Sequence, residues 1–409
     1  MKSIAEPIAS ARVRREEGRG LRRPALVFLA IAVALYVVAA VAHSALPEAK
    51  DAGGQSDLGA PSVLQGWVRF DSGWYASIAD NGYSYTKGQQ SSIAFFPGYP
   101  LALRGVTAVV DSDPIGGTLL TLVSGLAVAL LWWTWLRDRL EGRARMLAFS
   151  LLLLFPYAWF LYGTLYADAL FLAFVLGAFV LADRRHWVLA GLVGALATAT
   201  RPVAPAVIIG LIAVALDTSG ALTRVASRTD PARRRWHLDR GRLHPALAGV
   251  LLSGAGLAAW CAYLWSRFGD PVAFLTVQSA PGWAQGAGPH TWFKLGFFDL
   301  LFGGHLFALR LIPQGLATLA FLALAPAVWK RFGWGYGVYT LAVVGIPALG
   351  TGDFQGMGRY LLAAFPVFAL VGAWLTERAP GWLRAAAVPA SAVCLLLGTA
   401  MFASGFYLT

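Results

Sequence analysis

The clearest candidate for chemistry is a short polar segment, residues 69–83, which reads Arg-Phe-Asp-Ser-Gly-Trp-Tyr-Ala-Ser-Ile-Ala-Asp-Asn-Gly-Tyr. From Trp74 onward its aromatic and apolar residues recur at helical spacing, which predicts a short amphipathic helix. Asp71 lies one to two residues before the first turn of that helix. A carboxylate there can cap the helix N-terminus, and it can also face a cleft and take a proton from a reacting hydroxyl. The triplet that starts at Asp80 is typical of a helix end and a turn.

Three further charged residues lie at the ends of apolar runs, where a charge is costly unless it has a partner or a task. Arg201 and Arg359 are candidate phosphate ligands, because a guanidinium can bind a phosphate through two parallel hydrogen bonds. We expect Asp168 to orient a substrate or to support a second carboxylate. The alternatives are a helix cap for Asp168, a side chain that reaches the membrane surface for Arg201, and an ion pair with Asp353 for Arg359.

Aromatic residues accompany these charges. Residues 94–104, Ala-Phe-Phe-Pro-Gly-Tyr-Pro-Leu-Ala-Leu-Arg, indicate either the rigid wall of a cleft or an aromatic belt at a membrane surface. His290 and His305 lack the spacing of metal ligands, and no glycine-rich phosphate-binding or dinucleotide-binding motif occurs, so we expect neither a metal nor an organic cofactor. The candidate substrate contacts are Trp74, Tyr75, Tyr83, Tyr99, Trp283 and Tyr360.

Long apolar runs must position these residues. Of the 409 residues, 57% are apolar and 13% are charged, whereas soluble domains carry about 25% charged residues. This composition excludes an ordinary soluble enzyme and a disordered scaffold. Runs long enough to cross a bilayer fall at about 24–46, 115–136, 146–163, 167–182, 187–200, 202–216, 246–268, 305–328, 334–350, 360–376 and 385–405. The sequence thus predicts an all-α polytopic membrane protein, with a cytoplasmic basic tail over 1–23 and one transmembrane bundle over 24–409.

The net charge of +12 is distributed unevenly along the chain. Twenty-four of the 33 lysine and arginine residues fall in the N-terminal tail and in the connections near 137–145, 183–186, 217–245, 329–333 and 377–384. Because positively charged connections stay in the cytoplasm, we place these segments inside.

Two long loops, about 47–113 and 269–304, then lie on the outer face. We expect the Arg-rich loop 217–245 to fix this orientation and to contact anionic lipid. Nucleic acid would bind similar residues, but a membrane bundle is the wrong setting for it. Segment 93–110 does not fit simply, because a crossing there would turn the Arg-rich connections outward. The charge count favours a re-entrant or interfacial hairpin.

These motifs occur together in a known family. Residues 70–83, followed by Ala-Phe-Phe-Pro-Gly-Tyr-Pro, resemble the first outer loop of the PIG-V-type mannosyltransferases, which belong to the GT-C class of membrane glycosyltransferases. The chain departs from the family pattern at Phe70, where tryptophan is usual, and at Asp168, where glutamate is usual. Later pieces that resemble the family, in the same order, are Phe155-Pro156, residues 165–168, residues 199–202, residues 358–360 and Phe365-Pro366.

The resemblance implies a GT-C-like transmembrane helix bundle with interfacial helices in its long first outer loop. It also implies that a hexose, usually mannose, moves with inversion from a polyprenyl-phosphate donor to an acceptor hydroxyl at the outer face. In this scheme Asp71 is the base and Asp168 supports it, while Arg359 and Arg201 hold the donor phosphate. The acceptor would be a glycolipid, a lipoglycan or a protein hydroxyl, and nucleic acid is not a partner.

Two other classes of function stay open. A lipid or sugar transporter or flippase would explain the hydrophobicity, and it predicts discontinuous helices with polar residues at the membrane midplane. A non-catalytic subunit of a cell-envelope glycan assembly complex would explain the long aromatic loops, and it predicts that Asp71 is dispensable.

Overall fold

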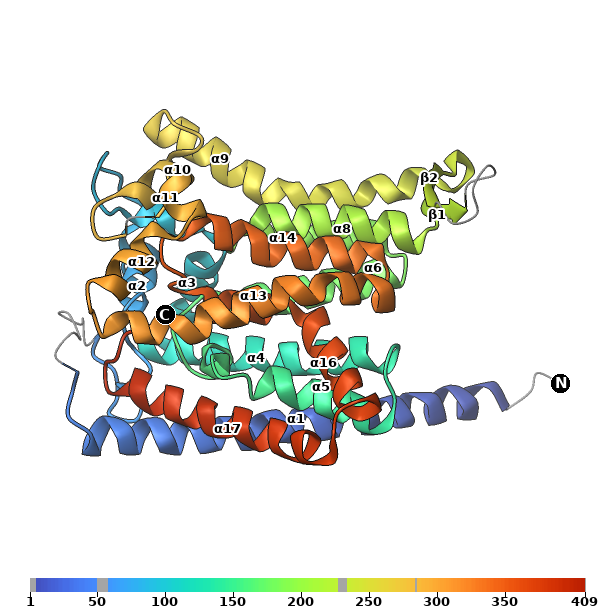
Figure 1. The fold of residues 1–409 in the computed structure, drawn as a ribbon, viewed down its shortest axis with the longest axis horizontal. Helices are drawn as coiled ribbons and strands as arrows, with labels where there is room; N and C mark the ends of the chain where they lie inside the picture. Colours follow the sequence, from blue (N-terminus) through green and yellow to red (C-terminus); the bar gives the residue numbers. More distant parts are fainter. Residues whose placement is uncertain (1–4, 50–57, 227–233, 284, 409) are drawn as a thin grey trace.

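The computed structural model of the chain describes residues 5–49, 58–226, 234–283 and 285–408. The first four residues of the predicted basic tail, residues 50–57 of the predicted first outer loop and residues 227–233 of the predicted Arg-rich loop lie outside the described residues. The described chain is almost entirely helical (Figure 1), which confirms the predicted all-α class.

Long helices form the body of the molecule, and most of them run along its longest axis (Figure 1). They are α1 (Ala5–Ala45), α4 (Asp113–Arg137), α5 (Gly142–Leu153), α6 (Asp168–Asp183), α7 (Trp187–Thr198), α8 (Ala204–Thr218), η4 (Pro245–Gly254) followed by α9 (Ala255–Phe268), α13 (Phe307–Phe332), α14 (Trp334–Gly350), α16 (Phe365–Glu377) and α17 (Gly381–Ala403). Neighbouring pairs include α4 with α6, α6 with α7, α8 with α14, α5 with α16, and α1 with α17.

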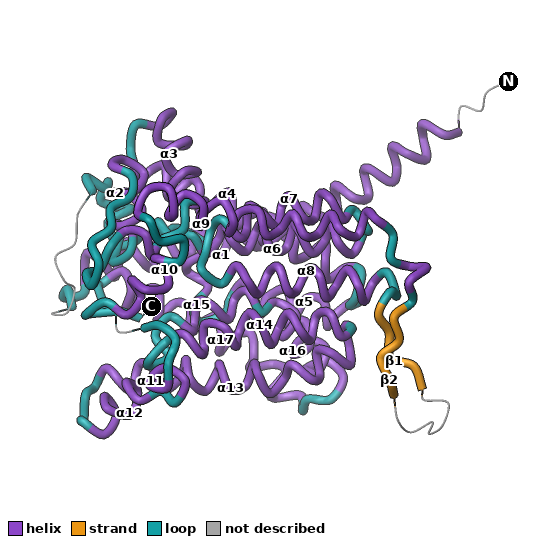
Figure 2. Tube along the Cα trace, turned by 90° about the horizontal axis from the view of Figure 1, so that it is seen from above, coloured by secondary structure: helices purple, strands orange, loops and turns teal. Residues whose placement is uncertain are grey.

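Short helices gather at one end of this body, at the left of Figures 1 and 2. They are α2 (Ser72–Asn81), α3 (Gly98–Val110), α10 (Ala273–Thr276), α11 (Pro289–Trp292) and α12 (Leu295–Phe302). The remaining short elements are η1 (Ser92–Ala94), η2 (Ala158–Leu161), η3 (Arg240–Arg242), η5 (Val277–Ser279), α15 (Met357–Tyr360) and η6 (Leu361–Ala363).

The opposite end carries the start of α1 and a two-stranded hairpin (Figure 2). Strands β1 (Leu222–Ala226) and β2 (Arg234–Leu238) pair antiparallel, with Leu222 opposite Leu238. The hairpin corrects the prediction of a simple loop over 217–245, because the residues on both sides of its tip pair through their backbones. Likewise, α1 begins at Ala5 and continues through most of the predicted basic tail into the first apolar run.

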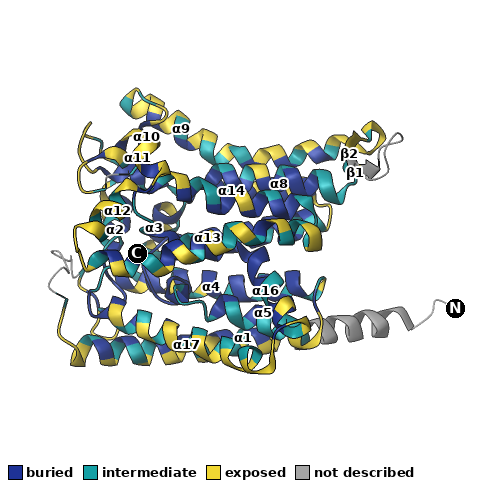
Figure 3. Ribbon diagram, viewed as in Figure 1, coloured by how far each residue is buried: buried dark blue, intermediate teal, exposed yellow. Residues whose placement is uncertain are grey.

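Five of the described helices are long and apolar enough to cross a membrane, and up to six if the bent pair 357–363 and 365–377 is one span. Their outer faces fit a lipid environment. On α1, Val33, Val37 and Val41 follow one another at four-residue intervals, and all three are more than half exposed. Helix α17 is mostly exposed or half-buried, with buried residues only toward its C-terminal end (Figure 3). Contiguous apolar surface of this kind is rare on soluble proteins, so the chain is a multi-pass membrane protein.

Several predicted runs differ from simple spans. The runs at 187–200, 202–216 and 334–350 form the shorter helices α7, α8 and α14, of 10–17 residues. Helix α5 ends at Leu153 inside the run 146–163, because Pro156 has no N–H to continue the helix. The run 360–376 bends by 79° at Ala364, just before Pro366. Within 93–110, α3 has 13 residues and is about 20 Å long at 1.5 Å per residue, which is shorter than the hydrocarbon core of about 30 Å.

Glycines allow the helix that leads to Arg201 to pack closely on its neighbour. A Cβ atom on Gly191 of α7 would lie 1.9 Å from the carbonyl oxygen of Gly249 in η4. A Cβ atom on Gly256 of α9 would lie 2.0 Å from the carbonyl oxygen of Ala195. Small residues at helix interfaces let membrane helices approach one another in this way. The contact fixes the end of α7, and therefore the turn at 199–201.

Candidate active site

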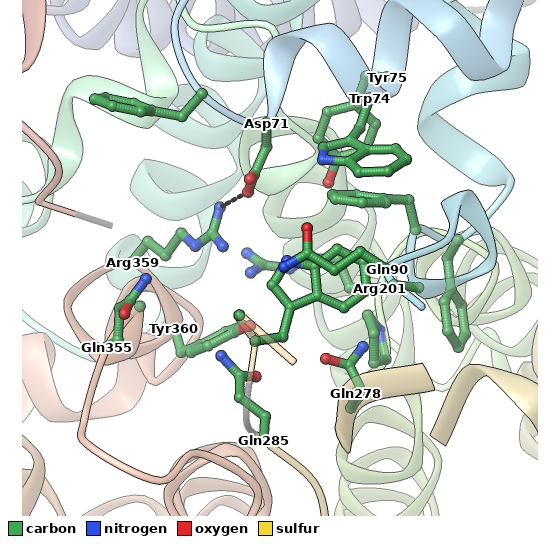
Figure 4. A pocket seen from close by; sticks show the side chains of 18 of the residues that line it. Asp71, Trp74, Tyr75, Gln90, Arg201, Gln278, Gln285, Gln355, Arg359 and Tyr360 are labelled. Carbon is green, nitrogen blue, oxygen red and sulfur yellow. Dashed lines mark hydrogen bonds and ion pairs between the residues drawn. The ribbon is translucent and has the colours of Figure 1, made fainter. Parts of the chain in front are cut away.

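A cavity of about 600 Å³ opens at the end where the short helices gather (Figure 4). Its walls come from the two long loops at about 47–113 and 269–304, the turn before α8, the segment around α15 and the C-terminal tail. The lining residues fall within 70–75, 90–96, 200–202, 278–285 and 355–360, together with Tyr407. Segments more than 300 residues apart in the sequence therefore build one site.

Asp71 occupies the N-cap position of α2, but its carboxylate makes no capping hydrogen bond to that helix in the described chain. Instead, Arg359 donates from Nη1 to Asp71 Oδ2 over 3.2 Å (Figure 4). The two side chains are 18% and 14% exposed, so both border the pocket while most of each is covered. The pocket-facing interpretation of Asp71 fits this geometry better than the capping one.

Asp168 is the first residue of α6 and forms an ion pair with Arg201. Its side chain is 3% exposed and lies behind Arg201, whereas Arg201 lines the pocket. The guanidinium of Arg201 also stacks on Tyr360, with 4.5 Å between Cζ and the ring centroid. The carboxylate of Asp168 therefore holds Arg201 in place and does not itself face the cavity.

Two tyrosines, Tyr166 and Tyr75, lie near the ion pairs. The backbone N–H of Asp71 donates to the Tyr166 hydroxyl over 3.0 Å, and that hydroxyl donates to the carbonyl oxygen of Arg69 over 3.4 Å. Tyr75 lines the pocket within reach of the charges of both pairs. Burial raises the pKa of Tyr75, against the opposing effect of Arg201, so its phenol stays protonated and able to donate a hydrogen bond.

The backbone near Asp71 and near Arg359 adopts left-handed conformations. Phe70, just before Asp71, has φ 52°, a left-handed conformation that costs a residue with a Cβ atom about 1–2 kcal/mol. Gly356 has φ 77°, and a Cβ atom added there would lie 3.3 Å from Tyr360 and 3.6 Å from Nε of Arg359. Glycine at 356 thus permits both the turn and the close approach of the guanidinium.

Two of the sequence motifs meet directly. The N–H of Gly98, in the Phe-Phe-Pro-Gly-Tyr-Pro segment, donates to the carbonyl oxygen of Ala199 over 2.7 Å. A Cβ atom on Gly98 would lie 2.6 Å from Thr200 Oγ1. The start of α3 therefore packs against the turn that carries Arg201, with no room for a side chain between them.

The structure brings most of the predicted site residues together, but Asp168, Tyr83 and Tyr99 do not line the pocket. Tyr99 is fully buried behind the wall, 4.8 Å from the ring of Tyr75. Tyr83 packs against Trp260 at 4.7 Å, in a separate aromatic cluster. The predicted residues that line the pocket are Asp71, Trp74, Tyr75, Arg201, Trp283, Arg359 and Tyr360.

Several lining residues were missed by sequence reasoning. Gln90 and Gln355 lie in loops next to predicted site segments, and Tyr407 lies beyond the last span. Neither glutamine carries a charge or belongs to a motif, so nothing in the local sequence marks them as site residues. Nothing in the local sequence of Tyr407 indicates that the C-terminal tail returns to the pocket.

Two guanidinium groups, those of Arg201 and Arg359, line the pocket. In the part of the chain that the structure describes, no three His, Cys, Asp or Glu side chains are grouped as metal ligands would be. Nε of Arg359 is buried and has no hydrogen-bond partner among the described residues. A guanidinium that retains unused donors beside an open cavity is a suitable partner for a phosphate.

Neither a protein-family model nor a curated protein sequence matches the chain. Among solved structures, the oligosaccharyltransferase of Archaeoglobus fulgidus tethered with an acceptor peptide aligns with 93% of this chain and 55% of its own length, at a TM-score of 0.43 and 13% identity. ArnT from Cupriavidus metallidurans bound to undecaprenyl phosphate aligns with 94% of this chain and 76% of its own length, at a TM-score of 0.50 and 14% identity. Through the match to ArnT, the chain has a fold that resembles the GT-C membrane glycosyltransferases.

Proposed function

We propose that the chain is a glycosyltransferase that moves a hexose from a polyprenyl-phosphate donor to an acceptor hydroxyl, with inversion at the anomeric carbon. The observation that carries this proposal is the pair of Asp71 and Arg359, 3.2 Å apart on the wall of the cavity. The bound undecaprenyl phosphate of ArnT supports the class of donor. The resemblance of the first outer loop to the PIG-V-type mannosyltransferases supports mannose as the sugar.

In the proposed reaction, the acceptor oxygen attacks the anomeric carbon while Asp71 takes its proton. The bond between the anomeric carbon and the phosphate oxygen breaks, and its electron pair leaves with the polyprenyl phosphate. Arg359 donates to that phosphate while Nη1 holds Asp71 in position. Hydrogen bonds aimed at a developing charge in a partly covered site stabilise the transition state more than they would in water.

Asp168 has a positioning role in this scheme. Its buried carboxylate fixes Arg201, whose planar guanidinium then faces the cavity from above Tyr360. A fixed arginine loses less side-chain entropy when it binds a phosphate than a mobile one does. The donor phosphate would lie between Arg201 and Arg359.

We infer that the pocket faces the outer side of the membrane and that the N-terminus is cytoplasmic. The N-terminal end of α1 and the hairpin, which belong to basic segments, lie at the end of the body opposite the short helices that surround the pocket (Figure 1). Basic segments are retained in the cytoplasm, which supports this orientation. The donor would then reach the pocket laterally from the membrane.

The proposal is tested with purified full-length protein, radiolabelled polyprenyl-phosphate mannose and a panel of glycolipid acceptors. We expect transfer by the wild type and a fall in kcat of about 10²–10⁴-fold for Asp71→Asn, because the amide cannot accept the proton. Asp80→Asn, at the other end of α2, is the matched control and should retain wild-type kcat. Polyprenyl-phosphate glucose in place of mannose tests the sugar.

Full transfer by Asp71→Asn would overturn the catalytic assignment. Retention of the anomeric configuration in the product, read by NMR, would overturn the inverting step. Passage of labelled lipid across proteoliposomes without any glycosidic product would instead favour a transporter.

A further inference from the structure

Four glutamine side chains line the same pocket and come from three separate loops: Gln90, Gln278, Gln285 and Gln355 (Figure 4). The backbone N–H of Gln285 donates to the carbonyl oxygen of Gln278 over 2.8 Å, which fixes the spacing of these two residues. Nε2 of Gln90 donates to the carbonyl oxygen of Pro281 over 3.3 Å, which ties the first outer loop to the second. The glutamines are therefore parts of one assembled wall.

Three of these amides are available to a ligand. The side chains of Gln278, Gln285 and Gln355 are half-buried and make no hydrogen bond to another described residue. Each amide offers one acceptor oxygen and two N–H donors. A hydroxyl group both donates and accepts, so several such amides match a surface with many hydroxyls. Covered polar groups of this kind are costly unless a ligand or water pairs with them.

Two tryptophans complete the wall. Trp74 and Trp283 line the pocket with 6.0 Å between their ring centroids, and Trp74 stacks on Phe95 at 5.7 Å. The stacking fixes the indole of Trp74. A rigid aromatic face next to amides offers an apolar surface and hydrogen bonds together. The C–H face and the hydroxyl edge of a pyranose ring have the same two properties.

The wall carries no charge of its own. Within the described lining, the charged side chains are Asp71, Arg201 and Arg359, and each of them has an ion-pair partner. The proposed function assigns both arginines to the donor phosphate. An anionic acceptor would find no further cation in the described lining, and a cationic acceptor would find no further carboxylate.

We propose that this wall of glutamines and tryptophans, the amide wall, is the acceptor subsite and that it binds a neutral hexose residue of a glycan or glycolipid. This inference rests on the proposed function and specifies its acceptor by chemical class. The amide wall holds the sugar ring so that one of its hydroxyls points toward Asp71.

Binding is tested without any transfer, by saturation-transfer NMR on the full-length protein in nanodiscs. The probes are methyl mannobioside, a disaccharide with one glucuronate residue, and a serine-containing tripeptide. We expect the neutral disaccharide to bind most tightly of the three. The double variant Gln278→Ala and Gln285→Ala should weaken its binding by about tenfold or more, whereas Gln89→Ala, an exposed glutamine outside the pocket, should not.

Kinetics with the same variants give a second readout. The double variant should raise the KM for a neutral glycan acceptor by about tenfold and leave the KM for the polyprenyl-phosphate donor unchanged. Attaching a lipid tail to the mannobioside distinguishes the sources of the sugar: tighter binding indicates a glycolipid, and unchanged binding indicates a soluble glycan. Both results support the subsite.

The failures of the two proposals are distinguishable. The acceptor assignment is overturned if wild type and double variant bind the neutral disaccharide equally. It is also overturned if the tripeptide or the glucuronate-containing disaccharide binds more tightly than the neutral one. A higher donor KM with an unchanged acceptor KM also overturns it, while transfer itself stands. The neutral disaccharide could bind, and the double variant could weaken that binding, while no donor supports transfer. This result would overturn the proposed function but leave the sugar site in place.

Discussion

An arginine and an aspartate form a partly buried ion pair in two regions of this molecule, and the two pairs differ in what surrounds them. Arg139 and Asp183 lie 2.6 Å apart, with side chains 17% and 14% exposed, much like Arg359 and Asp71. Asp183 also accepts from the Tyr336 hydroxyl over 2.7 Å, and that hydroxyl accepts from Nε1 of Trp135 over 2.8 Å.

The pair at Asp71 is longer, at 3.2 Å, and borders the larger cavity, which amides and aromatic rings also line. The hollow beside Arg139 is lined by Arg139, Arg331 and Phe332, and Arg331 is itself paired with Glu377. Residue type and exposure therefore do not separate the two pairs. A carboxylate with several donors is typical of a structural network. A carboxylate with one long contact and an open cavity in front of it is available for chemistry.

The largest expected effect is on catalysis at the pocket. Replacing Arg359 by alanine removes a donor to the leaving phosphate and should lower kcat by about 10²–10³-fold. Arg359→Lys keeps the positive charge but lacks the planar guanidinium, so its fall in kcat should be smaller than that of Arg359→Ala. Arg104→Ala, an exposed arginine on α3, serves as the control. Wild-type kcat in Arg359→Ala would place the pocket pair in the same structural class as Arg139 and Asp183.

The next effect is on stability at the other pair. Asp183→Ala leaves Arg139 without its carboxylate and should lower the free energy of unfolding by about 3–5 kcal/mol, as expected when one partner of a buried pair is removed. The kcat of the folded fraction should stay at the wild-type value, because Asp183 lies at the end of the body away from the pocket. Detergent denaturation monitored by tryptophan fluorescence measures the first quantity. A variant of wild-type stability would contradict the structural role.

A smaller effect is expected from the backbone beside Arg359. Gly356→Ala forces a Cβ atom into a left-handed conformation, which costs about 1–2 kcal/mol, and pushes on Tyr360 from 3.3 Å. We expect lower thermal stability together with a raised donor KM, since the guanidinium must shift. Gly105→Ala on α3, where an added Cβ meets nothing within 4 Å, is the matched control. Equal behaviour of the two variants would show that Gly356 is not required.

The last effect is confined to alkaline pH and concerns a buried cation that has no carboxylate in hydrogen-bond contact among the described residues. Nζ of Lys294 donates to the carbonyl oxygens of Ala348 and Thr351, and so holds the loop at 269–304 against the end of α14. Burial lowers the pKa of Lys294 to about 8, with Asp353 opposing, whereas an unfolded lysine titrates near 10.4, roughly two units higher.

Between these two pKa values the unfolded chain binds more protons than the folded one, so Lys294 makes stability rise with pH in that window. Below about pH 8, the lowered pKa of Lys294 in the folded chain, its contribution is constant. Lys294→Met should therefore reduce the rise in Tm between about pH 8 and pH 10, measured by thermal scanning. Parallel Tm profiles for wild type and variant would rule out the lowered pKa.

The sequence predicted the helical bundle well, because hydropathy is a property of local segments. The run at 115–136 became α4 at Asp113–Arg137, and the turn after Asp80 follows from Gly82, whose φ is 77°. Helix breaks were harder to predict. The bend at Ala364 and the end of α5 near Pro156 lie within apolar runs that hydropathy treats as continuous.

The sequence likewise indicated some residues of the candidate site and not others. Asp71, Asp168, Arg201 and Arg359 stood out in the sequence as isolated charges among apolar runs. Tyr83 and Tyr99 have the same local features as Tyr75, yet neither lines the pocket. Tyr99 lies buried behind Tyr75, and Tyr83 packs against Trp260 of α9, because tertiary packing decides which way each ring faces. Gln90 and Gln355 carry no charge, and nothing local separates them from ordinary loop residues.

Local hydropathy and charge were enough to establish that this is a helical membrane protein and which charged residues are too costly to be incidental. Both follow from transfer free energies of individual side chains and segments. The tertiary structure decided the partners. Asp71 pairs with Arg359, 288 positions away, and not with a helix end; Arg359 does not pair with its neighbour Asp353; and Asp168 pairs with Arg201 behind the pocket wall. Partners so distant are chosen by how the helices pack, and that choice depends on many side chains at once.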